Sequence, residues 1–405
     1  MVRSLSVFEI GKMINLETAK THIISKILDS SFEDGINIFL KNVVLLQDVN
    51  FIVPNPYKDS QSYIEDFKLL NLGNLDVNYF FQEDKLFFYN ADYFLNQANG
   101  RDVPLTIEKN ISLDTQITSY LYRKFNKQIN SIPKDIDEFS KLVRKRKWGV
   151  DSFAYFYENI LFNREFLSNQ TYKDSIYAFE SCFYKRREAR ERATKLIDMQ
   201  QEMLNSDMVN YYQRQYLSYY LSLLVMADIV LNNKGLTLLQ KEEKYAEVFH
   251  YKVGLISERE ANLAKLFFVY GTKVSFFGKI QKGNKNIIKD IKNMAWDVFH
   301  INNTIHNICI QSNKMIDFTM PYFITYDRRL KEILPIYKIN SAAFVKGTFD
   351  KYIHYQTDLI DPIIKNKYFV LKSFSERMEK IKDKNEKDML EHLNSLVIYY
   401  EGKLG

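Results

Sequence analysis

Four acidic residues stand where their carboxylates could act together. Asp114 and Asp327 each come soon after a short, β-prone apolar run, and Glu158 and Asp297 lie in stretches whose apolar residues recur at helical spacing. A group of carboxylates without His or Cys ligands makes a hard oxygen site, which suits Mg²⁺ or Mn²⁺. Beside a phosphodiester, these ions lower the pKa of a water molecule and stabilise the leaving oxygen. The residue types therefore indicate metal-assisted hydrolysis.

Residues 293–330 contain two of these acids and two elements that would position them. Apolar residues at helical spacing predict a helix in the first part, where Asp297 and His300 are three apart and share one face. After Pro321, residues 322–325 predict a short buried strand that ends close to Asp327. In open α/β sheets ligands bind at the carboxyl ends of the strands, so this pattern favours a functional site.

A second unit of strand, acid and helix reads ISLDTQITSYLYRKF. Residues 111–113 predict a short strand, Asp114 follows it, and apolar residues then recur at helical spacing. Asp114 could instead be a plain helix N-cap, because Asp is preferred at that position. Two other choices stay open: Asp48, near another strand-like run, rivals Asp114 as the first acid, and Glu165 rivals Glu158 as the acid on the central helix.

The composition is typical of a globular protein rich in helices. Of 405 residues, 46% are hydrophobic and 26% are charged, while only 13 are Gly and 7 are Pro, which argues against a β-sandwich. Cys182 and Cys309 lack paired spacing, which excludes a cysteine zinc site and fits a reducing cytosol. The sequence shows no signal-peptide layout and no apolar segment long enough to span a bilayer, so we expect a cytoplasmic protein without membrane contact.

The order ISLDT, then a Glu on a helix, then WDVFH and PYFITYD resembles that of the PIN-domain-like nucleases. The resemblance covers residues 110–165 and 290–330, and implies an α/β fold with a doubly wound parallel sheet. Compact members lack the large helical insertion and the long extensions found here. We expect five segments: an N-terminal mixed subdomain (1–108), the first part of the nuclease domain (109–169), a helical insertion (170–285), the second part of the nuclease domain (286–335) and a helical C-terminal extension (336–405).

The resemblance also implies a function, that of a metal-dependent endonuclease that cleaves RNA in preference to DNA, as in toxins and anti-phage effectors. It assigns catalysis and the binding of Mg²⁺ or Mn²⁺ to four acids: Asp114, Glu158, Asp297 and Asp327. It places three further residues around them, where they would hold the ligands in position: His300, Asp317 and Thr325. A regulatory protein partner and a homo-oligomer are left open.

A net charge of +6 permits a nucleic-acid partner. A run of four cations is the predicted phosphate-binding patch, although such a run can also be a solvated helix face: Arg144, Lys145, Arg146 and Lys147. A second basic stretch covers residues 282–292.

Two other classes of function remain open at this point. One is a non-catalytic interaction protein on a degenerate nuclease fold, in which the acids are caps and salt-bridge partners. The other is a different hydrolase in which His300 and His306 are the working groups, although a lone His on an amphipathic helix is more often structural.

Overall fold

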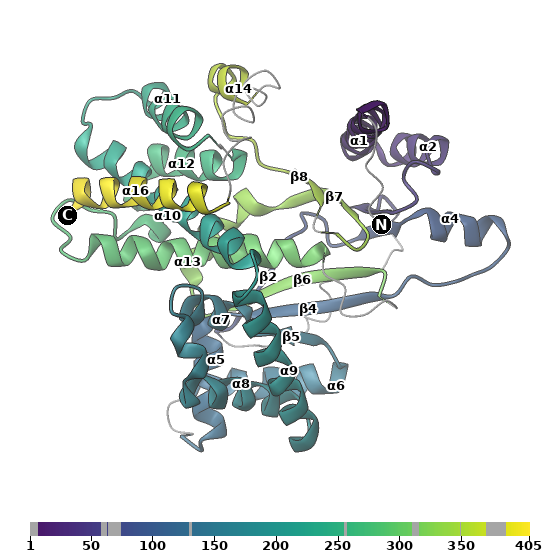
Figure 1. The fold of residues 1–405 in the computed structure, drawn as a ribbon, viewed down its shortest axis with the longest axis horizontal. Coiled ribbons are helices and arrows are strands. Elements are labelled where there is room, and N and C mark those ends of the chain that lie inside the picture. Colours follow the sequence, from purple (N-terminus) through teal and green to yellow (C-terminus); the bar gives the residue numbers. More distant parts are fainter. Residues whose placement is uncertain are drawn as a thin grey trace.

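Two four-stranded sheets, surrounded by helices, form the framework of the chain (Figure 1). The structure is a computed structural model, and it describes residues 7–57, 63, 74–128, 132–254, 257–309, 316–348, 350–369 and 386–405. One sheet contains both strand–acid units, and the other joins strands from the two ends of the chain.

The sheet with the strand–acid units has the strand order β2–β6–β4–β5. Its three parallel strands are β4 (Ile107–Leu113), β5 (Gly149–Asp151) and β6 (Phe318–Thr325), and β2 (Asp76–Tyr79) pairs antiparallel with β6. All of β6 is buried, as expected for a parallel strand covered on both faces. The α/β class and the parallel pairing are confirmed, within a small mixed sheet.

The central strand β4 lies between β6 and β5, the two parallel strands that follow it in the chain. From β4 the chain passes through α5 (Thr115–Phe125) and α6 (Lys134–Arg146) to β5 on one side, whereas β6 pairs on the other side. The order of the parallel strands therefore reverses at the β4–β6 pair. Such a reversal leaves a crevice at the carboxyl ends of the two strands, where ligands of open α/β sheets bind.

The second sheet is antiparallel throughout, with the order β3–β1–β7–β8. Its strands are β1 (Val49–Pro54), β3 (Leu86–Tyr89), β7 (Ile339–Val345) and β8 (Lys351–Tyr355). The prediction that residues 336–405 are a helical extension is therefore wrong for its first part. The apolar run of β7 has no clear alternation because all but its second and last residues are buried, so its period did not reveal a strand.

Helices from the N-terminal part cover one face of this antiparallel sheet. They are α1 (Val7–Leu28), α2 (Phe32–Lys41) and α4 (Ala91–Ala98). Their apolar side chains share a small core with Phe51, Tyr89 and Ala343 from three strands. The rings of Phe51 and Tyr89 are stacked with centroids 5.1 Å apart.

The described part of residues 170–285 is helical and contains no strand, as predicted. It does not form a separate appendage, however. In Figure 1, α8 (Gln170–Phe183) and α9 (Arg186–Leu204) lie beside α5 and α6, whereas α10 (Met208–Asn232) packs on α13 (Ile287–His306) and α16 (Glu386–Leu404). These helices and the mixed sheet share one hydrophobic core.

The remaining helical elements complete the fold. The α-helices among them are α7 (Phe153–Ile160), α11 (Leu238–Glu247), α12 (Glu258–Tyr270) and α14 (Pro362–Tyr368). A π-helical turn, η3, covers Val248–Val253. Single 3-10 turns are η2 (Arg164–Ser168), η4 (Gly271–Lys273), η5 (Ser275–Phe277), η6 (Asn307–Cys309), η7 (Arg328–Glu332) and η8 (Leu334–Tyr337).

Because α10 belongs to the common core, truncating one of its side chains should destabilise the whole fold. Leu224 has no exposed surface, so Leu224→Ala should lower the free energy of unfolding by about 2–5 kcal/mol. The half-exposed Leu239, on α11, is the control, and Leu239→Ala should change stability little. Calorimetry should show a single transition that moves as a whole. Two transitions, of which only one moves, would mean that the insertion is an independent unit.

Candidate active site

The register between β4 and β6 brings the first and last acids together. Leu113 lies level with Ile324, so the residues after both strands meet at the carboxyl edge of the sheet. The Thr325 hydroxyl donates a hydrogen bond to Asp114 Oδ2 at 2.6 Å, and accepts one from the Asp327 backbone N–H at 2.9 Å. One hydroxyl therefore fixes Asp114 and the backbone of Asp327 relative to each other.

Asp327 opens the turn η7 and is engaged by Arg329. Its Oδ1 accepts hydrogen bonds from the backbone N–H and from Nε of Arg329, both at 2.9 Å, and the two side chains form an ion pair. Burial acts to raise the pKa of Asp327, but the hydrogen bonds and the charge of Arg329 together outweigh it and lower the pKa. Asp327 is thus ionised and already paired with a cation.

Glu158, on α7, contacts His300, on α13. His300 Nε2 lies 2.8 Å from Glu158 Oε1, and the histidine side chain is only 3% exposed. The ring of Trp296 stacks on His300 at a centroid distance of 5.7 Å, and Tyr216 lies 4.0 Å from Trp296. The aromatic rings hold the imidazole in place, and the imidazole holds the glutamate.

Asp297 differs from the other three acids because no hydrogen bond or ion pair within the described residues stabilises its carboxylate. Burial raises the pKa of Asp297 well above its ordinary value, and the negative charges of Asp114, Asp327 and Glu158 raise it further, against the opposing charge of Arg329. The four predicted acids therefore come close enough to affect one another's ionisation, from β4, α7, α13 and the turn after β6.

A fifth acid, Asp151, was missed by the sequence reasoning. It ends β5 and accepts hydrogen bonds from Ser112 Oγ at 2.8 Å, Asn110 Nδ2 at 2.9 Å and the Phe153 N–H at 3.2 Å. Burial raises the pKa of Asp151 to about 6 against these hydrogen bonds. The signal was present in weak form, because Gly-Val-Asp followed by a helical run repeats the strand–acid–helix order. Three residues are too few to show a period of two.

Three other candidate acids lie away from this edge. Asp317 precedes β6 and accepts a hydrogen bond from the Thr106 N–H at 2.8 Å, so the eight residues of β6, about 25 Å in length, separate it from the site. Its predicted supporting role must be dropped. Asp48 precedes β1 rather than ending a strand, and pairs with Lys20 at 2.8 Å. Glu165 is exposed on η2.

The predicted phosphate-binding run, residues 144–147, also lies elsewhere. It is exposed at the end of α6, just before β5 begins, whereas the acids lie where the parallel strands end. Its last residue, Lys147, lines a cavity together with Glu108 in the first half of β4. By contrast, Lys279 contributes to the lowered pKa of Asp327. Lys279, which lies three residues before the basic stretch at residues 282–292, therefore acts on an acid of the site.

His300 and His306 do not form a working pair. His300 contacts Glu158, whereas Nδ1 of His306 contacts Nζ of Lys351. Burial, and then the positive charge of Lys351, lower the pKa of His306 to about 3, so its imidazole is neutral. The hydrolase with two working histidines therefore has no support in this geometry.

The donor chemistry at the acid edge fits a divalent cation that prefers oxygen ligands. An unpaired carboxylate, Asp297, lies among three further carboxylates, and such crowding is relieved by a cation. Within the described ranges, no three His, Cys, Asp or Glu side chains are arranged to hold a metal ion between them. The hydrogen bonds of Thr325, His300 and Arg329 direct the other acids elsewhere, so binding would require Asp327 to exchange Arg329 for the ion.

Replacing the two aspartates should move stability in opposite directions. Asp297→Asn removes a repelled charge and should raise the Tm in EDTA, whereas Asp327→Asn leaves Arg329 without its carboxylate and should lower it. Asp198, exposed on α9, is the control, and Asp198→Asn should leave the Tm nearly unchanged. A fall in Tm for Asp297→Asn would show that Asp297 has a stabilising partner instead.

Asp151 should make stability depend on pH. Its folded pKa is raised to about 6 from the ordinary value of 3.8, so the folded state is favoured at low pH and loses stability as the pH rises through this interval. The difference in unfolding free energy between Asp151→Asn and wild type should therefore grow between these values, by up to about 1.4 kcal/mol per unit of pKa shift. Denaturant melts at closely spaced pH values measure this. A difference that stays constant would contradict the raised pKa.

No helix in the described part of the chain has the length and apolar character needed to cross a membrane. Comparison with family models, with curated proteins and with solved structures gives no match for this chain.

Proposed function

We propose that this protein hydrolyses phosphodiester bonds of nucleic acid with the help of Mg²⁺ or Mn²⁺. The observation that carries the proposal is the position of Asp297, a carboxylate without a cation partner, beside Asp114, Asp327 and Glu158. These acids lie at the carboxyl edge of β4 and β6, where the strand order reverses. The narrower assignment to PIN-like endonucleases, with RNA as substrate, and to toxin or defence roles follows from the motif resemblance.

Each residue has a defined task in this proposal. Asp114, Asp297 and Asp327 would hold the ion, which when bound activates water and stabilises the leaving oxygen. Thr325 fixes Asp114, and His300 fixes Glu158. Arg329, once released from Asp327, would be free to bind the phosphate of the substrate.

Aromatic side chains beside the acids favour a nucleic-acid strand over a small phosphate ester. Phe162, just after α7, is 49% exposed, and its ring centroid lies 6.2 Å from that of Trp296. Trp296 in turn stacks on His300. Exposed aromatic rings near a basic stretch are typical of sites that hold single strands by stacking on their bases.

A second function also has an observation in its favour. In a non-catalytic interaction protein, Asp327 would serve as the permanent partner of Arg329 and Asp114 as the N-cap of α5. Asp114 makes no side-chain capping hydrogen bond, however, and Asp297 has no partner in the described residues, so the interaction protein leaves Asp297 unexplained.

Loss of one ligand charge should abolish cleavage without unfolding the protein. Asp297→Asn should remove Mn²⁺-dependent cleavage of a labelled single-stranded RNA, because an amide offers the ion a dipole in place of a full charge. His300→Ala should reduce the rate by about 10- to 100-fold, as expected for a residue that orients a ligand. Asp198→Asn is the control and should retain full activity. Full activity of Asp297→Asn would contradict the proposal.

Binding of single-stranded RNA should depend on the basic stretch at residues 282–292, which follows Lys279. Lys282 and Lys285 are exposed there, so Lys282→Gln with Lys285→Gln should weaken binding and reduce the salt slope by about 0.7 per lost phosphate contact. The matched control is Arg144→Gln with Lys145→Gln, at the other end of the sheet, which should change the slope little. If the substitutions at Arg144 and Lys145 reduced the salt slope more than those at Lys282 and Lys285, residues 144–147 would be the binding surface.

A further inference from the structure

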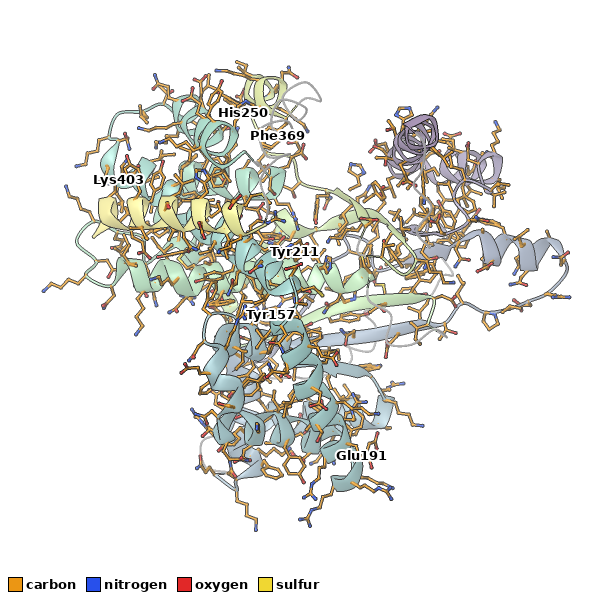
Figure 2. All side chains as sticks on the ribbon, viewed as in Figure 1. Tyr157, Glu191, Tyr211, His250, Phe369 and Lys403 are labelled. Carbon is orange, nitrogen blue, oxygen red and sulfur yellow. The ribbon has the colours of Figure 1, made fainter. Side chains whose placement is uncertain are left out.

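A cavity of about 260 Å³ lies apart from the four acids, between α10, η3 and the start of α12. None of the four acids lines it. Figure 2 labels Tyr211, one of its lining residues, near the middle of the molecule. Small-molecule pockets begin at about 300 Å³, so the cavity lies close to their lower limit and has no room for a segment of a macromolecule.

Polar side chains at the start of α12 line this cavity, and some of their hydrogen-bonding atoms have no partner among the described residues. Ser257 and Glu260 have the spacing of a capping box, yet Ser257 makes no side-chain capping hydrogen bond. Glu260 is 5% exposed, and its Oε1 has no hydrogen-bond partner in the part of the chain that the structure describes. A buried carboxylate oxygen without a donor is costly, so a ligand that offers an N–H group would stabilise it.

Two cations line the same cavity. Arg259 donates a hydrogen bond to Asn302 and lies over the ring of Tyr355, at 5.0 Å, but it forms no ion pair with a described carboxylate. Arg214, on α10, lies over the ring of Tyr211 at 5.8 Å and also donates a hydrogen bond to Sδ of Met389 at 3.5 Å. One guanidinium group can donate two parallel hydrogen bonds to phosphate oxygens. The backbone N–H groups at the start of α12 also favour an anion.

Three aromatic side chains, Tyr211, Tyr219 and Phe249, also line the cavity, together with Gln215, Ser218 and Val253. Flat apolar rings favour a planar ligand through stacking. A single ligand would match these groups if it had a phosphate for the arginines, a planar ring for the aromatic side chains and an N–H donor for Glu260. We propose that this cavity binds a nucleoside monophosphate.

This site does not depend on the proposed hydrolysis, so it is tested by binding alone. Thermal shift and isothermal titration of the full chain, without added metal, would use AMP, GMP, CMP and UMP as probes. Free nucleosides and inorganic phosphate would be the comparison ligands. At least one monophosphate should bind saturably and at least 10-fold more tightly than either part alone, because each part satisfies only some of the lining groups.

Two variants and a matched control tie that binding to the cavity. Arg214→Ala should weaken binding of the preferred monophosphate by at least 10-fold, and Glu260→Gln should weaken it and change the order of preference among the four bases. Arg187→Ala, on the exposed face of α9, should bind as wild type does. The proposal is overturned if no monophosphate binds, if phosphate alone binds equally well, or if both cavity variants, shown to be folded by circular dichroism, bind unchanged.

Discussion

Repulsion between carboxylates at the carboxyl edge of β4 and β6 is the physical constraint on which the candidate site depends. Parallel pairing places Leu113 level with Ile324, so the acids that follow the two strands are forced together by the backbone. Thr325 and Arg329 offset part of the repulsion at Asp114 and Asp327, yet Asp297 keeps a strongly raised pKa because of burial and its acidic neighbours. Proteins keep such unfavourable charges mainly at functional sites, which is why this edge supports the proposed function.

The rest of the fold holds that edge rigidly. Helix α13 carries both Asp297 and His300, and it packs between α10 and the mixed sheet within one hydrophobic core. The antiparallel sheet pairs strands from the two ends of the chain, so the segments before β4 and after β6 are joined to each other. A site built on strands and a buried helix can hold like charges together because the surrounding packing prevents their separation.

Sequence reasoning predicted the parts of this site that lie on regular, strongly patterned elements. Asp114 and Asp327 were found because a buried strand that stops at an acid is visible without a structure, and the helix of Asp297 was found from its apolar period. Strand β5 was missed because it has three residues, and β7 because most of it is buried. The error at Asp317 had a different cause, because the predicted strand began only after Pro321, whereas β6 begins at Phe318 and is about 25 Å long. The pairing of Asp327 with Arg329 depends on the turn after β6, which residue type alone does not fix.

The most direct test of the account is a crystal structure of the protein grown with Mn²⁺, with data collected at a wavelength where manganese scatters anomalously. The account predicts an anomalous peak within bonding distance of Asp114, Asp297 and Asp327, with the guanidinium of Arg329 turned away from Asp327. An edge without such a peak at saturating Mn²⁺, with the Asp327–Arg329 ion pair intact, would contradict it.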